Sequence, residues 1–203
     1  IQDADSDPDC EASLQKKPPT VVTDTRDEAG RKRPQVVIVS GLPRSGTSMM
    51  MQMLAAGGLA IYTDGERVPD ENNPRGYYEA DLAKGLAKRN RWVHDCDGQV
   101  VKVVAPLVRY LPLSIDYKVI FMDRPIEEIV RSQSRMLERL EKKSSRLLDD
   151  RMTRIMRGDV HAALSLLSIH NHSILPLKYA DVVANPREAA AAICEFLALD
   201  LDE

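Results

Sequence analysis

The stretch VVIVSGLPRSGTS at residues 36–48 decides the fold of this chain. Its first four residues form a continuous β-branched run, which is typical of a strand buried on both faces of a parallel sheet. The run leads into Gly41-x-x-x-x-Gly46, and a helical stretch follows over about 45–56. A glycine-rich turn between a strand and a helix directs backbone N–H groups at an anion, and the helix dipole there also favours negative charge. The stretch therefore predicts a loop that binds a phosphate-like group.

Further strands and helices alternate along the rest of the chain. Apolar runs at 100–104 and 118–122 predict two more buried strands. The other predicted elements are helices over about 79–93, 126–140, 148–167 and 184–197, and a strand over 174–177 that Pro176 places at a sheet edge. This alternation indicates an α/β fold, with a three-layer P-loop-type sheet of mainly parallel strands flanked by helices.

Composition and charge exclude several classes of protein. The 203 residues include 28 Lys and Arg against 31 Asp and Glu, so the net charge of −3 argues against broad nucleic-acid binding. No apolar run reaches the roughly 18–20 residues that cross a bilayer, and no signal-peptide pattern is present, so we expect a cytoplasmic protein. Residues 1–33 are expected to be a charged tail or linker, and residues 34–203 the folded domain. Oligomeric state and the role of the tail stay open.

The cation of the loop lies at an unusual place. A nucleotide-triphosphatase loop carries Lys directly after its second glycine, whereas this chain has Thr47 there and places Arg44 inside the loop. From that position Arg44 can reach a bridging or terminal oxygen of a bound anion. The loop therefore departs from those that bind ATP and GTP.

This loop resembles the 5′-phosphosulfate loop of the sulfotransferase superfamily, and the resemblance is nearest to bacterial sulfotransferase-family proteins. These enzymes take a sulfuryl group from 3′-phosphoadenosine 5′-phosphosulfate (PAPS). The resemblance implies that the loop residues bind this donor, namely Pro43, Arg44, Ser45, Gly46, Thr47 and Ser48.

A second segment resembles the family's 3′-phosphate motif. Arg124 ends a predicted strand, and Ser132 follows eight residues later in a predicted helix. The resemblance implies that both bind the 3′-phosphate. Eight helical residues span about 12 Å, so the pair can hold one anion only if the strand end lies alongside the helix.

A third segment, residues 177–197, resembles a late family motif in which a tyrosine lies near the adenine. Tyr179 matches that tyrosine, and an anchoring role in the core is the open alternative. The resemblance runs from about residue 35 to 199. The family's final Arg-Lys-Gly segment has no match before Glu203, so either the chain stops early or this group does without the segment.

The catalytic residues match the family in part. Lys102 matches a lysine that stabilises the transferring group, whereas Val104 stands where many members have a histidine base. Other families use a Glu after the first helix, which makes Glu66 the preferred base and Glu79 and Asp64 further candidates. A solvated loop or helix-capping role is the alternative for each carboxylate.

These observations predict a PAPS-dependent sulfotransferase that modifies a hydroxyl or amine and leaves 3′,5′-ADP, with no metal required. The acceptor stays open among carbohydrate, peptide and small molecule. A P-loop kinase or NTPase is one alternative, since Asp123 ends a hydrophobic strand as a magnesium-binding Asp would. A non-catalytic relative that binds 3′,5′-ADP is the other.

Overall fold

The central sheet has four parallel strands. The computed structural model describes residues 33–63, 78, 80–139 and 146–199. The strands are β1 (Gln35–Gly41), β2 (Val100–Lys102), β3 (Asp116–Asp123) and β4 (Ser173–Lys178), in the order β2-β1-β3-β4. Helices flank the sheet on both faces, which confirms the predicted α/β class.

Strand register brings the carboxyl ends of the strands to one edge. β1 and β3 pair along their whole length, from Gln35 opposite Asp116 to Gly41 opposite Met122. β4 pairs with β3 at the edge of the sheet, and its Pro176 lies opposite Phe121. The edge position predicted from Pro176 is therefore confirmed.

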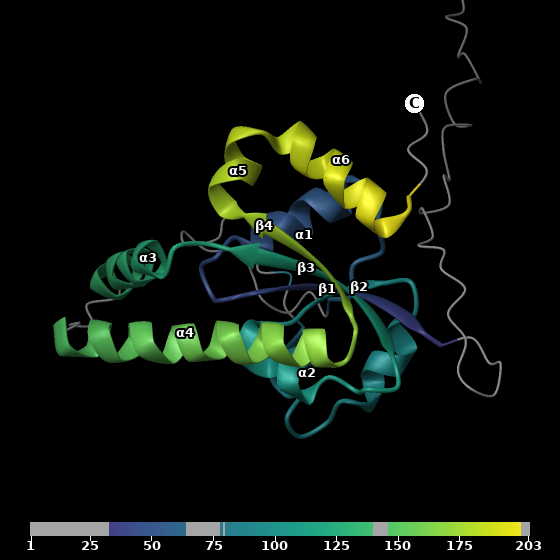
Figure 1. Cartoon of the computed structure of the whole chain (residues 1–203), viewed down its shortest axis with the longest axis horizontal. Helices are drawn as coiled ribbons and strands as arrows, with labels where there is room; N and C mark the ends of the chain where they lie inside the picture. Colours follow the sequence, from purple (N-terminus) through teal and green to yellow (C-terminus); the bar gives the residue numbers. More distant parts are fainter. Residues whose placement is uncertain (1–32, 64–77, 79, 140–145, 200–203) are drawn as a thin grey trace, which may run out of the picture.

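The helices form the two outer layers of the molecule. Figure 1 shows α1, α5 and α6 over one face of the sheet and α4 over the other, with α3 beside α4 beyond the ends of the strands. The helices are α1 (Thr47–Ala56), α2 (Asp81–Lys84), α3 (Ile126–Arg139), α4 (Arg146–Ile169), α5 (Tyr179–Ala184) and α6 (Pro186–Leu197), with 3-10 turns η2 (Arg91–Cys96) and η3 (Ala105–Tyr110). No helix in the described ranges is both long and apolar enough to cross a membrane.

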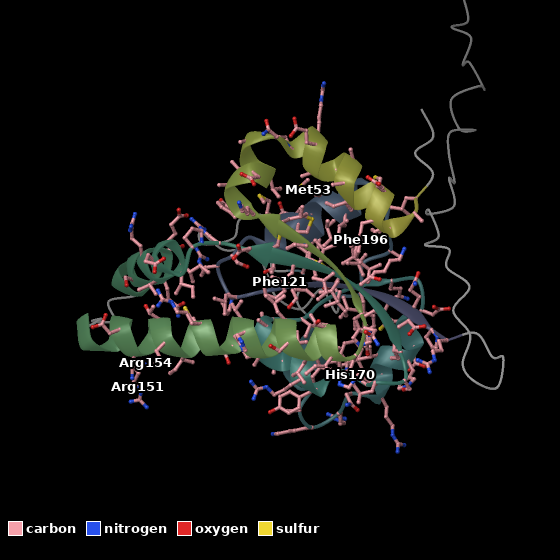
Figure 2. All side chains as sticks on the ribbon, in the orientation of Figure 1. Met53, Phe121, Arg151, Arg154, His170 and Phe196 are labelled. Carbon is pink, nitrogen blue, oxygen red and sulfur yellow. The ribbon has the colours of Figure 1, made fainter. Side chains whose placement is uncertain are left out.

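The core lies on both sides of β1 because its successive side chains alternate between the two faces. Val37 and Val39 pack towards α1 and α6, in the cluster that Met53 and Phe196 border in Figure 2. Val36 belongs instead to the cluster beneath α3 and α4. The continuous β-branched run thus serves two cores, as predicted.

Two helical predictions need correction. The helix expected over 79–93 is broken: α2 ends at Lys84, and Gly85 follows it as the C-cap. A 3-10 turn begins only at Arg91. The helix expected from residue 184 begins at Pro186 instead, after the separate short helix α5.

Candidate anion-binding site

The candidate site lies where the sheet topology changes direction. The chain leaves β1 for α1 on one face of the sheet, and it leaves β3 for α3 on the opposite face. Crevices outside the carboxyl ends of parallel strands at such a point are where open α/β sheets bind ligands. The predicted loop follows β1 at this edge, and Arg124 follows β3.

The loop between β1 and α1 requires its two glycines. Gly41 has a φ of +144°, and a Cβ there would lie 2.6 Å from the carbonyl oxygen of Met122. Gly46 has a φ of +100°, and a Cβ there would lie 2.6 Å from Cδ2 of Tyr179. The glycines thus allow the loop to turn tightly against β3 and the Tyr179 ring.

The start of α1 is suited to an anion. Among the described residues, no side chain caps this helix and its first turn contains no acidic residue. The positive end of its dipole is therefore not offset by a carboxylate of that turn. Thr47 is buried, Pro43 is exposed, and the Ser45 hydroxyl is buried without a hydrogen-bond partner in the described part of the chain. This arrangement fits the phosphosulfate group expected from the sequence.

Arg124 is fixed by three contacts. Its Nε donates to Oε2 of Glu128 at 3.0 Å, and Nη1 donates to the carbonyl oxygen of Arg44 at 3.0 Å. Its guanidinium carbon lies 4.2 Å from the centre of the Tyr179 ring, within cation–π range. Arg124 therefore joins the end of β3 to the loop, to α3 and to α5.

Arg44 joins the first motif to the second. Its Nε donates to the Ser132 hydroxyl on α3 at 3.2 Å, while its own carbonyl accepts from Arg124. The strand end and the helix are thus both in contact with this one residue. That Arg124 and Ser132 together hold one anion stays a prediction.

Lys102 reaches the loop from the end of β2. Its side chain is 6% exposed, and its Nζ donates to the Ser48 hydroxyl at 3.1 Å. The structure therefore brings together the predicted residues of β2, the loop, α3 and the end of β3. The base candidates Glu66, Glu79 and Asp64 lie outside the described residues.

Two features of the site were not evident from the sequence. Glu128 was not predicted as a site residue, although its i, i+4 spacing from Arg124 across a helix start is the pattern of an ion pair. Tyr179 is half-buried, and the Arg124 guanidinium lies over its ring. Its predicted place near the adenine stays a prediction.

Among the described residues, no group of three or more His, Cys, Asp or Glu could hold a metal.

Comparison with known proteins gives the family. A model of the sulfotransferase family matches residues 77–203. A search of curated proteins finds no match.

Solved structures resemble this chain at low sequence identity. The sulfotransferase domain of the Synechococcus PCC 7002 olefin synthase is 16% identical, with a TM-score of 0.51 over 88% of this chain and 78% of its own. The sulfotransferase domain from the curacin biosynthetic pathway is 14% identical, with a TM-score of 0.48 over 84% of this chain and 76% of its own. A mouse sulfotransferase in complex with PAP is 14% identical, with a TM-score of 0.49 over 89% of this chain and 63% of its own.

Proposed function

Because this chain belongs to the sulfotransferase family, we propose that it transfers a sulfuryl group from PAPS to a hydroxyl or amine of an acceptor. The observation that carries the proposal is the gathering of cations around the loop. Arg44, Lys102 and Arg124 come from three places in the sequence and contact the loop or lie within it. A chain with a net charge of −3 thus concentrates positive charge at one edge of its sheet.

The two anionic ends of PAPS match two parts of this site. The loop, the start of α1 and Lys102 suit the 5′-phosphosulfate, because they combine backbone N–H groups, hydroxyls and a buried cation. Arg124 and Ser132 suit the 3′-phosphate, since a guanidinium and a hydroxyl both donate to phosphate oxygens. We assign the two phosphate groups to these two parts because each part contains one of the two sequence motifs. Lys102 contacts Ser48 in the first part, and Arg124 contacts Glu128 in the second.

The chemistry asked of the protein is mainly electrostatic. PAPS supplies the sulfuryl group, and 3′,5′-ADP is left when the bond from sulfur to the bridging oxygen breaks. Lys102 is placed beside Ser48 to stabilise the negative charge that develops on that oxygen. A carboxylate, Glu66 by preference over Glu79, takes the proton from the acceptor as its oxygen or nitrogen bonds to sulfur. Arg44, whose Nε donates to the Ser132 hydroxyl, is the second cation that we expect to stabilise this charge.

The proposal is tested first by calorimetry with 3′,5′-ADP. We expect binding to the wild-type chain, and loss of that binding in an Arg124→Ala/Ser132→Ala double variant. Equal binding by the two proteins would contradict the assignment of the 3′-phosphate site. Turnover of ATP or GTP that depends on magnesium would favour a P-loop kinase or NTPase instead.

A transfer assay separates an enzyme from a non-catalytic relative. Sulfur-labelled PAPS is incubated with panels of carbohydrate, peptide and phenolic acceptors, and labelled product is measured. We expect label in at least one class, and loss of this label in a Lys102→Met variant. Binding of 3′,5′-ADP with no transfer to any class would support the non-catalytic alternative.

A further inference from the structure

A small cavity lies at the amino edge of the sheet, where the strands begin. The seven residues of β1 span about 20 Å, so this cavity is well separated from the loop at the carboxyl edge. It has a volume of about 190 Å³. It lies between the beginnings of β1, β3 and β4 and the turn that leads from α4 into β4 (Figure 1). The residues around it include Gln35, Asp116, Lys118, Asn171, His172 and Ser173.

Two buried polar side chains line this cavity without a hydrogen-bond partner. Lys118 is 8% exposed and makes no hydrogen bond or ion pair with any described residue. Gln35 is 6% exposed, and its Oε1 accepts no hydrogen bond in the described part of the chain. Lys118 pairs with Val37, two residues after Gln35, so both side chains lie on the same face of the sheet. The cavity therefore brings a buried cation next to a buried acceptor.

The arrangement of these two groups lowers stability in the absence of a ligand. A buried polar atom without a hydrogen bond destabilises the folded state, and a buried charge does so more strongly. The Phe196 ring, whose centre is 5.9 Å from the Lys118 Nζ, lies near the outer limit of a cation–π contact and offsets little of this. Unfavourable arrangements of this kind are concentrated where side chains bind ligands.

The other groups around the cavity leave one positive charge in it. The Asp116 carboxylate forms an ion pair with Arg33 at 3.6 Å. Burial, and then the charge of His170, lower the pKa of His172 below 6.5, so this ring is neutral near pH 7. Asn171 and Ser173 are exposed, neutral and able to donate hydrogen bonds. Since Arg33 neutralises Asp116, the charge that remains among the described lining residues is that of Lys118.

A ligand that satisfies both buried groups carries an anion and a hydrogen-bond donor close together. A carboxylate accepts from the Lys118 Nζ, and an adjacent hydroxyl or ammonium group donates to the Gln35 Oε1. A single negative charge also balances the single positive charge. The volume of about 190 Å³ equals that of about six water molecules at roughly 30 Å³ each. This is less than the roughly 300 Å³ at which pockets for larger ligands begin, so a nucleotide is excluded.

We propose that this cavity is a second binding site, for a small carboxylate that carries an adjacent hydroxyl or amino group. Lys118 binds the carboxylate, and Gln35 accepts a hydrogen bond from the adjacent group. The site lies on β1 and β3, the same strands that lead to the candidate anion-binding site, but at their opposite ends. The inference therefore does not depend on the proposed function.

The test is an NMR titration in which the backbone amides of Lys118 and Ser173 report on the cavity. Lactate and alanine carry a carboxylate and an adjacent donor, propionate carries a carboxylate alone, and sulfate is an inorganic anion. The variants are Lys118→Met and Gln35→Met, with Lys88→Met as the control because Lys88 is an exposed lysine outside the cavity. Lys118→Met removes a buried charge, so it is expected to fold at least as stably as the wild type.

We expect lactate, alanine or both to bind the wild type and Lys88→Met with a Kd of about 1 mM. Propionate should bind about three- to ten-fold more weakly, because it donates no hydrogen bond to Gln35. Lys118→Met should weaken binding at least about ten-fold, and Gln35→Met should remove the advantage over propionate. Both variants should keep the wild-type affinity for 3′,5′-ADP, since neither residue lies at the carboxyl edge.

Three results would overturn the inference. No binding of lactate or alanine up to roughly 50 mM would mean that the cavity holds only water. Equal affinities of the wild type and Lys118→Met would remove the assigned cation. Tighter binding of sulfate or propionate than of lactate and alanine would contradict the assigned class of ligand. Each result would leave the proposed function untouched, because that function is tested separately with 3′,5′-ADP and PAPS.

Discussion

At the scale of single residues, the site depends on side chains that fix one another before any ligand arrives. Arg124 touches Glu128, the Arg44 carbonyl and the Tyr179 ring, and Tyr179 in turn lies against Gly46. Side chains held in this way lose little conformational entropy when they bind a ligand. A change at any of these positions should therefore alter nucleotide affinity in a definite direction.

Gly46→Ala should damage both stability and binding. The new Cβ would meet the Tyr179 ring, and a φ of +100° is itself strained for alanine. We expect a loss of about 1–3 kcal/mol in the free energy of unfolding, measured with urea, and weaker binding of 3′,5′-ADP. Gly98→Ala is the control: Gly98 has a φ of +71° with nothing within 4 Å, so it should lower stability and leave affinity unchanged. Equal effects of both variants on affinity would contradict this account.

Glu128→Gln should strengthen nucleotide binding. The amide keeps an oxygen for the Arg124 Nε but removes a negative charge next to the proposed phosphate site. Because the Glu128 side chain is 45% exposed, solvent screens its charge, and we expect only about a two- to five-fold gain for 3′,5′-ADP. The gain should shrink at high salt and be absent for 5′-AMP. Weaker binding of 3′,5′-ADP would show that the full charge of Glu128 is needed to hold Arg124.

The sequence indicated which residues lie at this site better than it indicated where their side chains point. Arg124, Ser132 and Lys102 were candidates because their segments resemble family motifs, and the structure brings all three into contact with the loop or with Arg44. The contact of Arg44 with Ser132 could not, because it depends on a left-handed residue and on two elements whose packing no local pattern encodes. Glu128 was overlooked because an i, i+4 ion pair is ordinarily a surface feature.

At the scale of elements, α6 covers the face of the sheet that carries α1. Leu197 is fully buried in the cluster with Val37 and Met50. Leu197→Ala should lower the free energy of unfolding by about 2–5 kcal/mol, measured by urea denaturation. The control is Val183→Ala on α5. Because Val183 is 53% exposed, this variant should lose less than about 0.5 kcal/mol in the free energy of unfolding. Similar losses of stability in the two variants would mean that α6 contributes little to this core.

Lys118 on β3 should make stability depend on pH. It is 8% exposed, lies 5.9 Å from the Phe196 ring centre, and makes no ion pair with any described residue. Burial lowers its pKa below the ordinary value of 10.5. The unfolded chain therefore holds this proton to higher pH than the folded chain does, so stability rises as pH passes from the lowered pKa towards 10.5.

Lys118→Met should remove that rise. We expect the variant to be about 1–2 kcal/mol more stable than the wild type near pH 7, because a buried charge without an ion-pair partner is lost. This difference in the free energy of unfolding should narrow towards pH 10.5, where the wild-type lysine loses its charge in both states. Urea denaturation of both proteins between pH 7 and 10 measures it. A difference that stays constant across this range would show that burial does not lower the pKa of Lys118.

The strands could be predicted better than the helices between them. A continuous β-branched run led to β1, an apolar run led to β3, and Pro176 led to the edge position of β4. The helix expected over 79–93 failed because Gly85 ends α2, and its apolar residues instead serve separate short turns. The local stop signal of Gly85 therefore outweighed the helical periodicity of this segment.

At the scale of the whole molecule, the parallel sheet explains how an acidic chain gathers cations at one edge. Four strands that run the same way bring the loop, Lys102, Arg124 and Tyr179 to one edge (Figure 1). Net charge is summed over the surface, whereas affinity depends on the local field at this edge. The value of −3 therefore argues against nucleic-acid binding without arguing against a nucleotide site.

The most direct measurement of the central claim is a crystal structure of this chain with 3′,5′-ADP. The account predicts the 5′-phosphate in the loop after β1, near Lys102, and the 3′-phosphate between Arg124 and Ser132. A nucleotide bound elsewhere, or bound with its 3′-phosphate away from Arg124 and Ser132, would contradict it.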